Sequence, residues 1–205
     1  ARKPGEGSQH SQSLQAVFGH FPGIRVGMPS TPKDAKGMLL TATAGEDPTI
    51  ILEHRSLFEE MGFVPRDCYG TPMEARVMCS GEHVTIVAFS AAVKDALYAA
   101  EELRRDIVSC EVIDLRWIRP LDIETIVRSV RKTKRLLVVD TGWKAFGVAS
   151  EIVASVCERI GPKLESLPRR ITLPDTPCPA SAALERHYHP TVFDIIQAVN
   201  SMVSE

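Results

Sequence analysis

The stretch at residues 140–147 (Asp-Thr-Gly-Trp-Lys-Ala-Phe-Gly) combines an acid, a lysine, two aromatic rings and two glycines. It follows an apolar run and precedes a helical pattern, so it should connect a strand to a helix N-terminus, where anions are favoured. Its spacing is neither GxGxxG nor GxxxxGK[ST], so it carries neither the dinucleotide nor the Walker-type phosphate motif. The stretch is therefore a candidate loop-borne site whose ligand the motif does not name.

Other acidic residues follow predicted strands, at the sheet edge where open α/β folds bind ligands. They are Glu53 (followed by His54), Asp114, Asp140 and Asp175. Each also suits a helix cap or a loop carboxylate, which is the more common role for such residues. No GxSxG nucleophile motif accompanies them.

The histidines and cysteines offer one candidate for proton transfer and no metal motif. His10 lies between Gln9 and Ser11, just before an amphipathic segment, so an exposed imidazole could exchange protons near neutral pH. His187 and His189 flank a tyrosine, but no third ligand is near them in sequence, so we expect a surface pair and no metal site. The five cysteines form no CxxC pair, and scattered single cysteines are typical of a reducing, intracellular setting.

The bulk properties exclude two classes of partner. The 205 residues carry a net charge of −2, and the densest basic stretch, residues 128–135, is typical of a solvated helix C-terminus. Nucleic-acid binding through phosphate contacts is therefore not expected. No apolar run approaches the ~18–20 residues that cross a bilayer, so we expect no membrane partner.

The elements that must position these residues form two parts with a connection between them. Residues 1–65 predict a helix at 13–19, a strand at 24–28, a helix from Thr31-Pro32 and an apolar strand at 49–52, which together indicate a parallel β-α-β unit. Residues 66–82 are rich in glycine and proline and are expected to be a linker. Residues 83–205 alternate strands and helices about every 26 residues, which is typical of β-α units.

The second part has clear helix boundaries and predicts an α/β domain. Its strands are expected at 84–89, 110–114, 136–140 and 171–173. Asp122 can cap one helix, and Thr191 and Asp194 form a capping-box-like pair before the last one.

The chain resembles the β subunits of the thiamine-diphosphate-dependent 2-oxo acid dehydrogenases, which include the pyruvate, branched-chain and acetoin enzymes and are related to transketolase. Several motifs carry this resemblance in the expected order. They are Gln-His-Ser-Gln-Ser at 9–13, Pro-Gly-Ile-Arg-Val at 22–26, Met-Pro-Ser-Thr-Pro at 28–32, Asp-Ala-Lys-Gly at 34–37, Val-Thr-Ile-Val at 84–87, Glu-Val-Ile-Asp-Leu-Arg at 111–116, Arg-Pro-Leu-Asp at 119–122 and Pro-Asp-Thr-Pro at 174–177.

The resemblance implies a three-layer α/β/α architecture with mostly parallel sheets. Residues 1–65 would be the last part of a pyrimidine-binding domain, and residues 83–205 a transketolase C-terminal domain. It also implies about 120 further N-terminal residues, which would hold the glutamate that activates the cofactor. We therefore expect no cofactor-binding residue of known position in this chain, and no activity from the chain alone.

The resemblance assigns a catalytic role to His10 alone, as a group that handles protons or orients the substrate carboxylate and the lipoyl group. Thiamine diphosphate with Mg²⁺ would be bound mainly by the missing segment and an α subunit. The other partners would be a second β subunit and a lipoyl acyltransferase core. Some family members hold a structural monovalent cation at the turn that corresponds to residues 42–47. The expected location is the cytoplasm, or the mitochondrial matrix in a eukaryote.

Two departures from the family pattern leave alternatives open. Residues 140–147 lack the usual acid, proline and glycine pair, and Glu53-His54-Arg55 replaces a common Glu-Pro. The first alternative is a two-chain transketolase-like enzyme that transfers ketol units, for which Lys144 is the one candidate phosphate ligand. The second is a non-catalytic assembly module.

Overall fold

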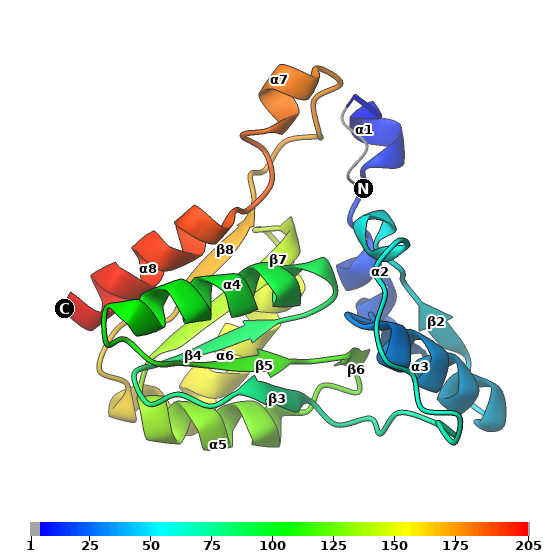
Figure 1. The fold of residues 1–205 in the computed structure, drawn as a ribbon, viewed down its shortest axis with the longest axis horizontal. Helices are drawn as coiled ribbons and strands as arrows, with labels where there is room; N and C mark the ends of the chain where they lie inside the picture. The colour runs from blue at the N-terminus through cyan, green and yellow to red at the C-terminus, as the bar shows by residue number, and fades with distance from the viewer. Residues whose placement is uncertain (1–4, 205) are drawn as a thin grey trace.

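The computed structural model describes residues 5–204 and consists of two sheets with their helices (Figure 1). The larger sheet has five strands in the order β3-β5-β4-β7-β8, and all neighbours are parallel except the edge pair β3–β5. Its strands are β3 (Arg76–Cys79), β4 (Val84–Ala88), β5 (Cys110–Asp114), β7 (Leu136–Trp143) and β8 (Arg169–Leu173).

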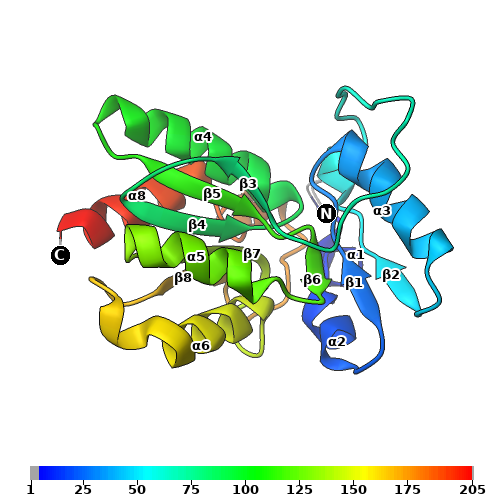
Figure 2. The same ribbon diagram turned by 90° about the horizontal axis from the view of Figure 1, so that it is seen from below.

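Helices cover both faces of this sheet, as Figure 2 shows. One face carries α4 (Ala91–Arg105) and α8 (Val192–Ser204), and the other carries α5 (Ile123–Thr133) and α6 (Val148–Ile160). β4 is buried along its whole length because it receives side chains from both helical layers. The predicted three-layer α/β/α architecture is confirmed for this part.

Helix boundaries in this part follow the capping residues read from the sequence. The Asp122 side chain accepts a hydrogen bond from the Thr125 amide at 3.1 Å, and Thr191 and Asp194 bond reciprocally through side chain and backbone. The basic stretch lies at the end of α5, where Lys134 adopts a left-handed conformation (φ 58°) and pairs with Glu165. Both cap predictions and the helix-end prediction are confirmed.

The smaller sheet combines strands from both predicted parts. β1 (Arg25–Gly27) and β2 (Thr49–Ile51) are parallel and joined by α3 (Pro32–Ala44), which Thr31 caps through the Asp34 amide. β6 (Trp117–Arg119) then pairs antiparallel with the free edge of β1. Because β6 belongs to the second part of the sequence, the two parts share a sheet.

Several short elements complete the described chain. α1 (Gly7–His10) and α2 (Gln15–His20) precede the small sheet, so the helix predicted at 13–19 begins two residues later and ends one later. The others are the 3₁₀ turns η1 (Arg55–Leu57) and η2 (Gly161–Lys163) and the short helix α7 (Ala182–Glu185). Within residues 5–204 no helix is both long enough and apolar enough to cross a membrane.

The structure differs from the sequence expectation in two strands. β3 lies inside the predicted linker at 66–82, where it forms the antiparallel edge of the large sheet. β6 occupies residues for which no strand was expected. Both strands are only three or four residues long and gain their hydrogen bonds from distant partners, so local periodicity is too short to reveal them.

Candidate functional site

His10 lies at the exposed C-terminal end of α1, on the outside of the molecule. Two contacts with the α7 region hold this short helix, which Figure 1 shows beside α7. The Gly5 amide donates a hydrogen bond to Glu185 Oε2 at 2.7 Å. Gly7 has a φ of +69°, a backbone conformation that favours glycine, and a Cβ there would meet the Ala180 Cβ at 3.4 Å. The backbone before His10 is thus fixed while its ring faces outward.

Asp140, the acid of the predicted loop site, is fully buried and has a structural role. Its Oδ1 accepts hydrogen bonds from the Gly142 amide at 2.7 Å and the Gln15 side chain at 3.0 Å. Its Oδ2 accepts from the Ala149 amide in the first turn of α6 at 3.2 Å. Burial raises the pKa of this carboxyl, and the three donors oppose the shift. Asp140 therefore anchors the loop, α6 and α2 to one another.

The loop borders a cavity of about 350 Å³ between α2 and the start of α6. Its walls combine the predicted loop with residues of the N-terminal part. The lining residues include Gln15, His20, Phe21, Asp140, Trp143 and Phe146. Lys144 and His10 are not among its lining residues, and the Lys144 side chain is exposed. His10 therefore does not line the cavity that is bordered by residues 140–147, the candidate site predicted from the sequence.

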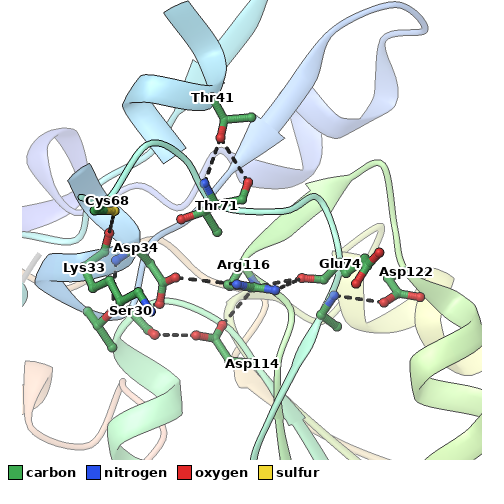
Figure 3. A network of polar contacts seen from close by, with 12 residues as sticks. Ser30, Lys33, Asp34, Thr41, Cys68, Thr71, Glu74, Asp114, Arg116 and Asp122 are labelled. Carbon is green, nitrogen blue, oxygen red and sulfur yellow. Dashed lines mark hydrogen bonds and ion pairs between the residues drawn. The ribbon is translucent and has the colours of Figure 1, made fainter. Parts of the chain in front are cut away.

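Asp114, at the end of β5, lies in a buried polar network that crosses between the two parts of the fold (Figure 3). The Ser30 hydroxyl donates to Asp114 Oδ2, and the Arg116 amide donates to Oδ1 at 3.0 Å. The Arg116 guanidinium lies 3.7 Å from Asp34 Oδ1 on α3 and donates through Nε to the Glu74 carbonyl at 2.9 Å. This network joins α3, the segment before β3 and the end of β5.

Burial is the main influence on the Asp114 carboxyl and raises its pKa to about 6. Hydrogen bonds from Ser30 and from the Arg116 amide oppose the shift, and the nearby Asp34 carboxylate adds to it. Sequence reasoning singled out Asp114 by its position after a strand but not Ser30, Asp34 or Arg116 as its partners. The only sequence signal for these partners was the presence of a serine, an acid and an arginine close to predicted apolar strands.

The remaining strand-end residues have local roles. His54 Nδ1 accepts a hydrogen bond from the Ser56 amide at 3.3 Å and so caps η1, while Glu53 and Asp175 are exposed. His187 is exposed, whereas His189 lies against Glu185, with Nε2 3.6 Å from Oε1. The two histidines thus face different surroundings and do not act as an i, i+2 pair.

The turn at residues 42–47 does not fit a monovalent cation. The Arg25 guanidinium forms an ion pair with Asp47 at this turn, and a Cβ at Gly45 would lie 2.9 Å from Arg25 Nη1. A resident positive charge repels a second cation, and it already neutralises the nearest carboxylate. We therefore derive no role for a cation there.

Comparison with known families gives two successive matches along the chain. Residues 73–195 match the model of the transketolase C-terminal domain, and residues 5–60 match that of the transketolase pyrimidine-binding domain. The chain belongs to the transketolase family. Within this family's C-terminal domain lie all five strands of the large sheet, including β3.

Curated relatives of this transketolase-family chain are named as subunits of larger enzymes. The pyruvate dehydrogenase E1 component subunit beta of Rickettsia felis is 39% identical over 196 residues, which cover 95% of this chain and 60% of the relative. The protein of the same name from Bacillus subtilis is 38% identical over the same shares. The acetoin:2,6-dichlorophenolindophenol oxidoreductase subunit beta of Cupriavidus necator is 38% identical over 93% of this chain and 57% of that protein. The chain thus spans about 60% of the length of these relatives.

A solved structure supports the fold. It is described as a split gene transketolase, inactive beta4 tetramer, and superimposes with a TM-score of 0.77 over 93% of this chain and 60% of that chain. The two sequences are 23% identical, so the likeness concerns architecture alone.

Proposed function

We propose that this chain is the larger part of a β subunit of a heteromeric thiamine-diphosphate enzyme. The enzyme would oxidatively decarboxylate a 2-oxo acid and pass the acyl group to a lipoyl carrier. The observation that carries the proposal is the sequence identity of 38–39% over nearly the whole chain to pyruvate dehydrogenase and acetoin enzyme β subunits. The 2-oxo acid itself is left open, because its pocket would lie on other segments and on the partner.

The chain's own residues fit a supporting role toward the cofactor. When bound, thiamine diphosphate supplies the carbanion chemistry, and the protein supplies placement and proton transfer. Mg²⁺ prefers oxygen ligands. The only group of potential metal ligands found within residues 5–204 contains a thiol and an imidazole, which does not suit that ion. The proposal therefore assigns the diphosphate and Mg²⁺ to an α subunit and the activating glutamate to an N-terminal segment.

His10 is the residue that we assign to the reaction. Its imidazole is exposed, and within residues 5–204 it forms no hydrogen bond or ion pair, so both ring nitrogens are open to a ligand. An imidazole can accept or donate a proton during a reaction and can orient a carboxylate through a hydrogen bond. The fixed backbone at Gly5 and Gly7 would keep the ring at one place during turnover.

Exposed apolar side chains support the proposed assembly with an α subunit and a second β subunit. A groove of about 770 Å³ between η1 and α4 includes Met61 and Phe63, which are 96% and 85% exposed. Exposed apolar patches of this kind mark protein interfaces. A lipoyl acyltransferase core is the further partner that acyl transfer would require. All five cysteines are free thiols, which agrees with a reducing compartment such as the cytoplasm or the mitochondrial matrix.

A calorimetric titration tests the proposal. Thiamine diphosphate with Mg²⁺ is titrated into the full-length gene product co-expressed with its α-like partner, and we expect saturable binding with a Kd of about 1–10 μM. Bound enzyme is then assayed with 2-oxo acids and, separately, with sugar phosphates. Turnover of a 2-oxo acid supports the proposal, and turnover of sugar phosphates alone replaces it with ketol transfer. A well-folded heteromer that binds no cofactor would show a non-catalytic assembly module.

A further inference from the structure

Three side chains with metal-binding chemistry lie close together in the segment between β8 and α8. Cys178 lies in the loop after β8, Glu185 ends α7, and His189 follows four residues later. Their ligand atoms all lie within 4.8 Å of one another. Cys178 is 4% and Glu185 5% exposed, and the His189 side chain is 19% exposed. A thiol, a carboxylate and an imidazole converge here in a largely water-excluded place.

The separation of the His189 and Glu185 ligand atoms suits two ligands of one tetrahedral ion better than a hydrogen bond between the two side chains. His189 Nε2 and Glu185 Oε1 are 3.6 Å apart, which is too long for a hydrogen bond. Zinc bonds of about 2.0–2.2 Å to nitrogen and oxygen place two such ligands about 3.4 Å apart across a tetrahedral angle. The two atoms therefore stand near the separation that a shared ion requires.

Neighbouring contacts orient Glu185 and close the loop that carries the three ligands. Glu185 Oε2 accepts the Gly5 amide at 2.7 Å, which leaves Oε1 directed toward His189. The Tyr188 hydroxyl donates to the Thr176 carbonyl at 2.7 Å and so ties the two ends of the loop. Metal ligands are commonly oriented by such outer contacts.

We infer that Cys178, Glu185 and His189 form a binding site for a zinc-class divalent ion. Mixed sulfur, nitrogen and oxygen ligands select Zn²⁺ or Co²⁺ over Mg²⁺ and Ca²⁺. Three protein ligands leave a fourth position for water. Because Glu185 accepts a hydrogen bond from the Gly5 amide, the ion would fasten the segment that carries His10 to the α7 loop. The inference does not depend on the proposed function.

Titration of the metal-free protein with Co²⁺ tests this inference. The expected result is one equivalent bound, with thiolate-to-cobalt charge-transfer absorption and the visible bands of tetrahedral Co²⁺, both removed by Zn²⁺. Cys178→Ser and His189→Gln should each weaken binding by ~100-fold or more, since loss of even outer contacts costs 10–100-fold. The matched controls Cys157→Ser and His187→Ala should bind as the parent does, because Cys157 lies on α6 and His187 is exposed.

Thermal unfolding gives a second readout. Zn²⁺ should raise the Tm of the parent and of both controls but not that of Cys178→Ser or His189→Gln. Three results would overturn the inference: no Co²⁺ bound by the folded parent, absorption without thiolate character, or unchanged binding in Cys178→Ser.

Discussion

Single residues with similar chemistry serve different purposes in this molecule, and their surroundings decide which. His10 is exposed and open to a ligand, whereas Asp114 and Asp140 are fully buried. Both acids were marked as candidates because they end or follow predicted strands, and in the structure Asp114 is the last residue of β5 and Asp140 lies within β7. Asp140 satisfies backbone donors of its own loop and of α6, and Asp114 links two parts of the fold. Position after a predicted strand therefore selected two buried acids and two exposed ones, Glu53 and Asp175, and only the tertiary structure showed which were buried.

Replacement of His10 tests its assigned role directly. In the full-length protein with its α partner, His10→Ala should depress turnover or acyl transfer by ~10²-fold or more, which is the usual effect of losing a general acid–base. Steady-state kinetics measure the change, and an unaltered Kd for thiamine diphosphate would show an intact site.

The exposed histidine His187 provides the control for His10. His187→Ala removes an imidazole from the neighbouring α7 region and should leave turnover unchanged. Parent-like turnover in His10→Ala would remove the residue from the mechanism.

Asp114 should make folding stability depend on pH. Its folded pKa of about 6 lies above the ordinary value of 3.8, so the folded protein binds more protons between these values. Its contribution to the free energy of unfolding therefore falls as pH rises from about 4 to 6 and is constant above. A shift of about two pKa units corresponds to on the order of 3 kcal/mol.

Asp114→Asn lacks this titration while keeping the shape of the side chain. Urea unfolding at several pH values should show the parent losing stability relative to Asp114→Asn over that range. Asp175→Asn removes an exposed acid and should follow the parent. A constant difference between the parent and Asp114→Asn would contradict the raised pKa.

At the scale of elements, the edge strand β3 depends on one close backbone approach. Gly81 follows β3 and lies against β5, where a Cβ would come within 2.2 Å of the Cys110 carbonyl carbon. The Cys110 backbone cannot move aside as a flexible side chain does. The space beside Gly81 is therefore too small for any side chain.

Gly81→Ala should destabilise the protein by about 1–3 kcal/mol, the usual cost of overpacking. Denaturant unfolding measures the loss. Gly161→Ala is the matched control, because its Cβ would meet its nearest neighbour, the Cys157 Cβ, at an ordinary 3.8 Å. Equal stability of the two variants would show that β3 moves to accept the methyl group.

The whole molecule is held together by contacts that cross between its two parts. β6 pairs with β1, Gln15 bonds Asp140, and Arg116 joins Asp34 to Glu74. The large sheet has its own buried clusters on both faces. The small sheet depends more on the junction, because β2 is only half-buried.

Removal of Arg116 should loosen the small part before the large one. Arg116→Leu leaves the buried Asp34 carboxylate without its guanidinium, a change that typically costs several kcal/mol. Hydrogen exchange should show amides of α3 losing protection by ~10-fold or more, while β4 and β7 keep theirs.

Arg159→Leu is the control for Arg116→Leu. It breaks an exposed pair with Glu124, whose contribution is small because solvent screens it. Equal loss of protection in α3 and β4 upon Arg116→Leu would mean that the molecule opens as one unit.

The sequence by itself determined the elements whose signals are local. Apolar runs and capping residues predicted the buried strands β4 and β5 and the starts of α5 and α8, because helix ends depend on neighbouring side chains. The family motifs predicted the three-layer architecture and marked His10.

Only the tertiary structure decided what depends on residues far apart in the chain. β3 is stabilised by pairing with β5, and β6 by pairing with β1. A sequence pattern of three or four residues does not predict such a distant pairing partner. The Asp114 network and the group of Cys178, Glu185 and His189 likewise arise from loops brought together by the sheets. The physical reason is that hydrogen bonds and ligand geometry require proximity in space, which spacing along a chain does not fix.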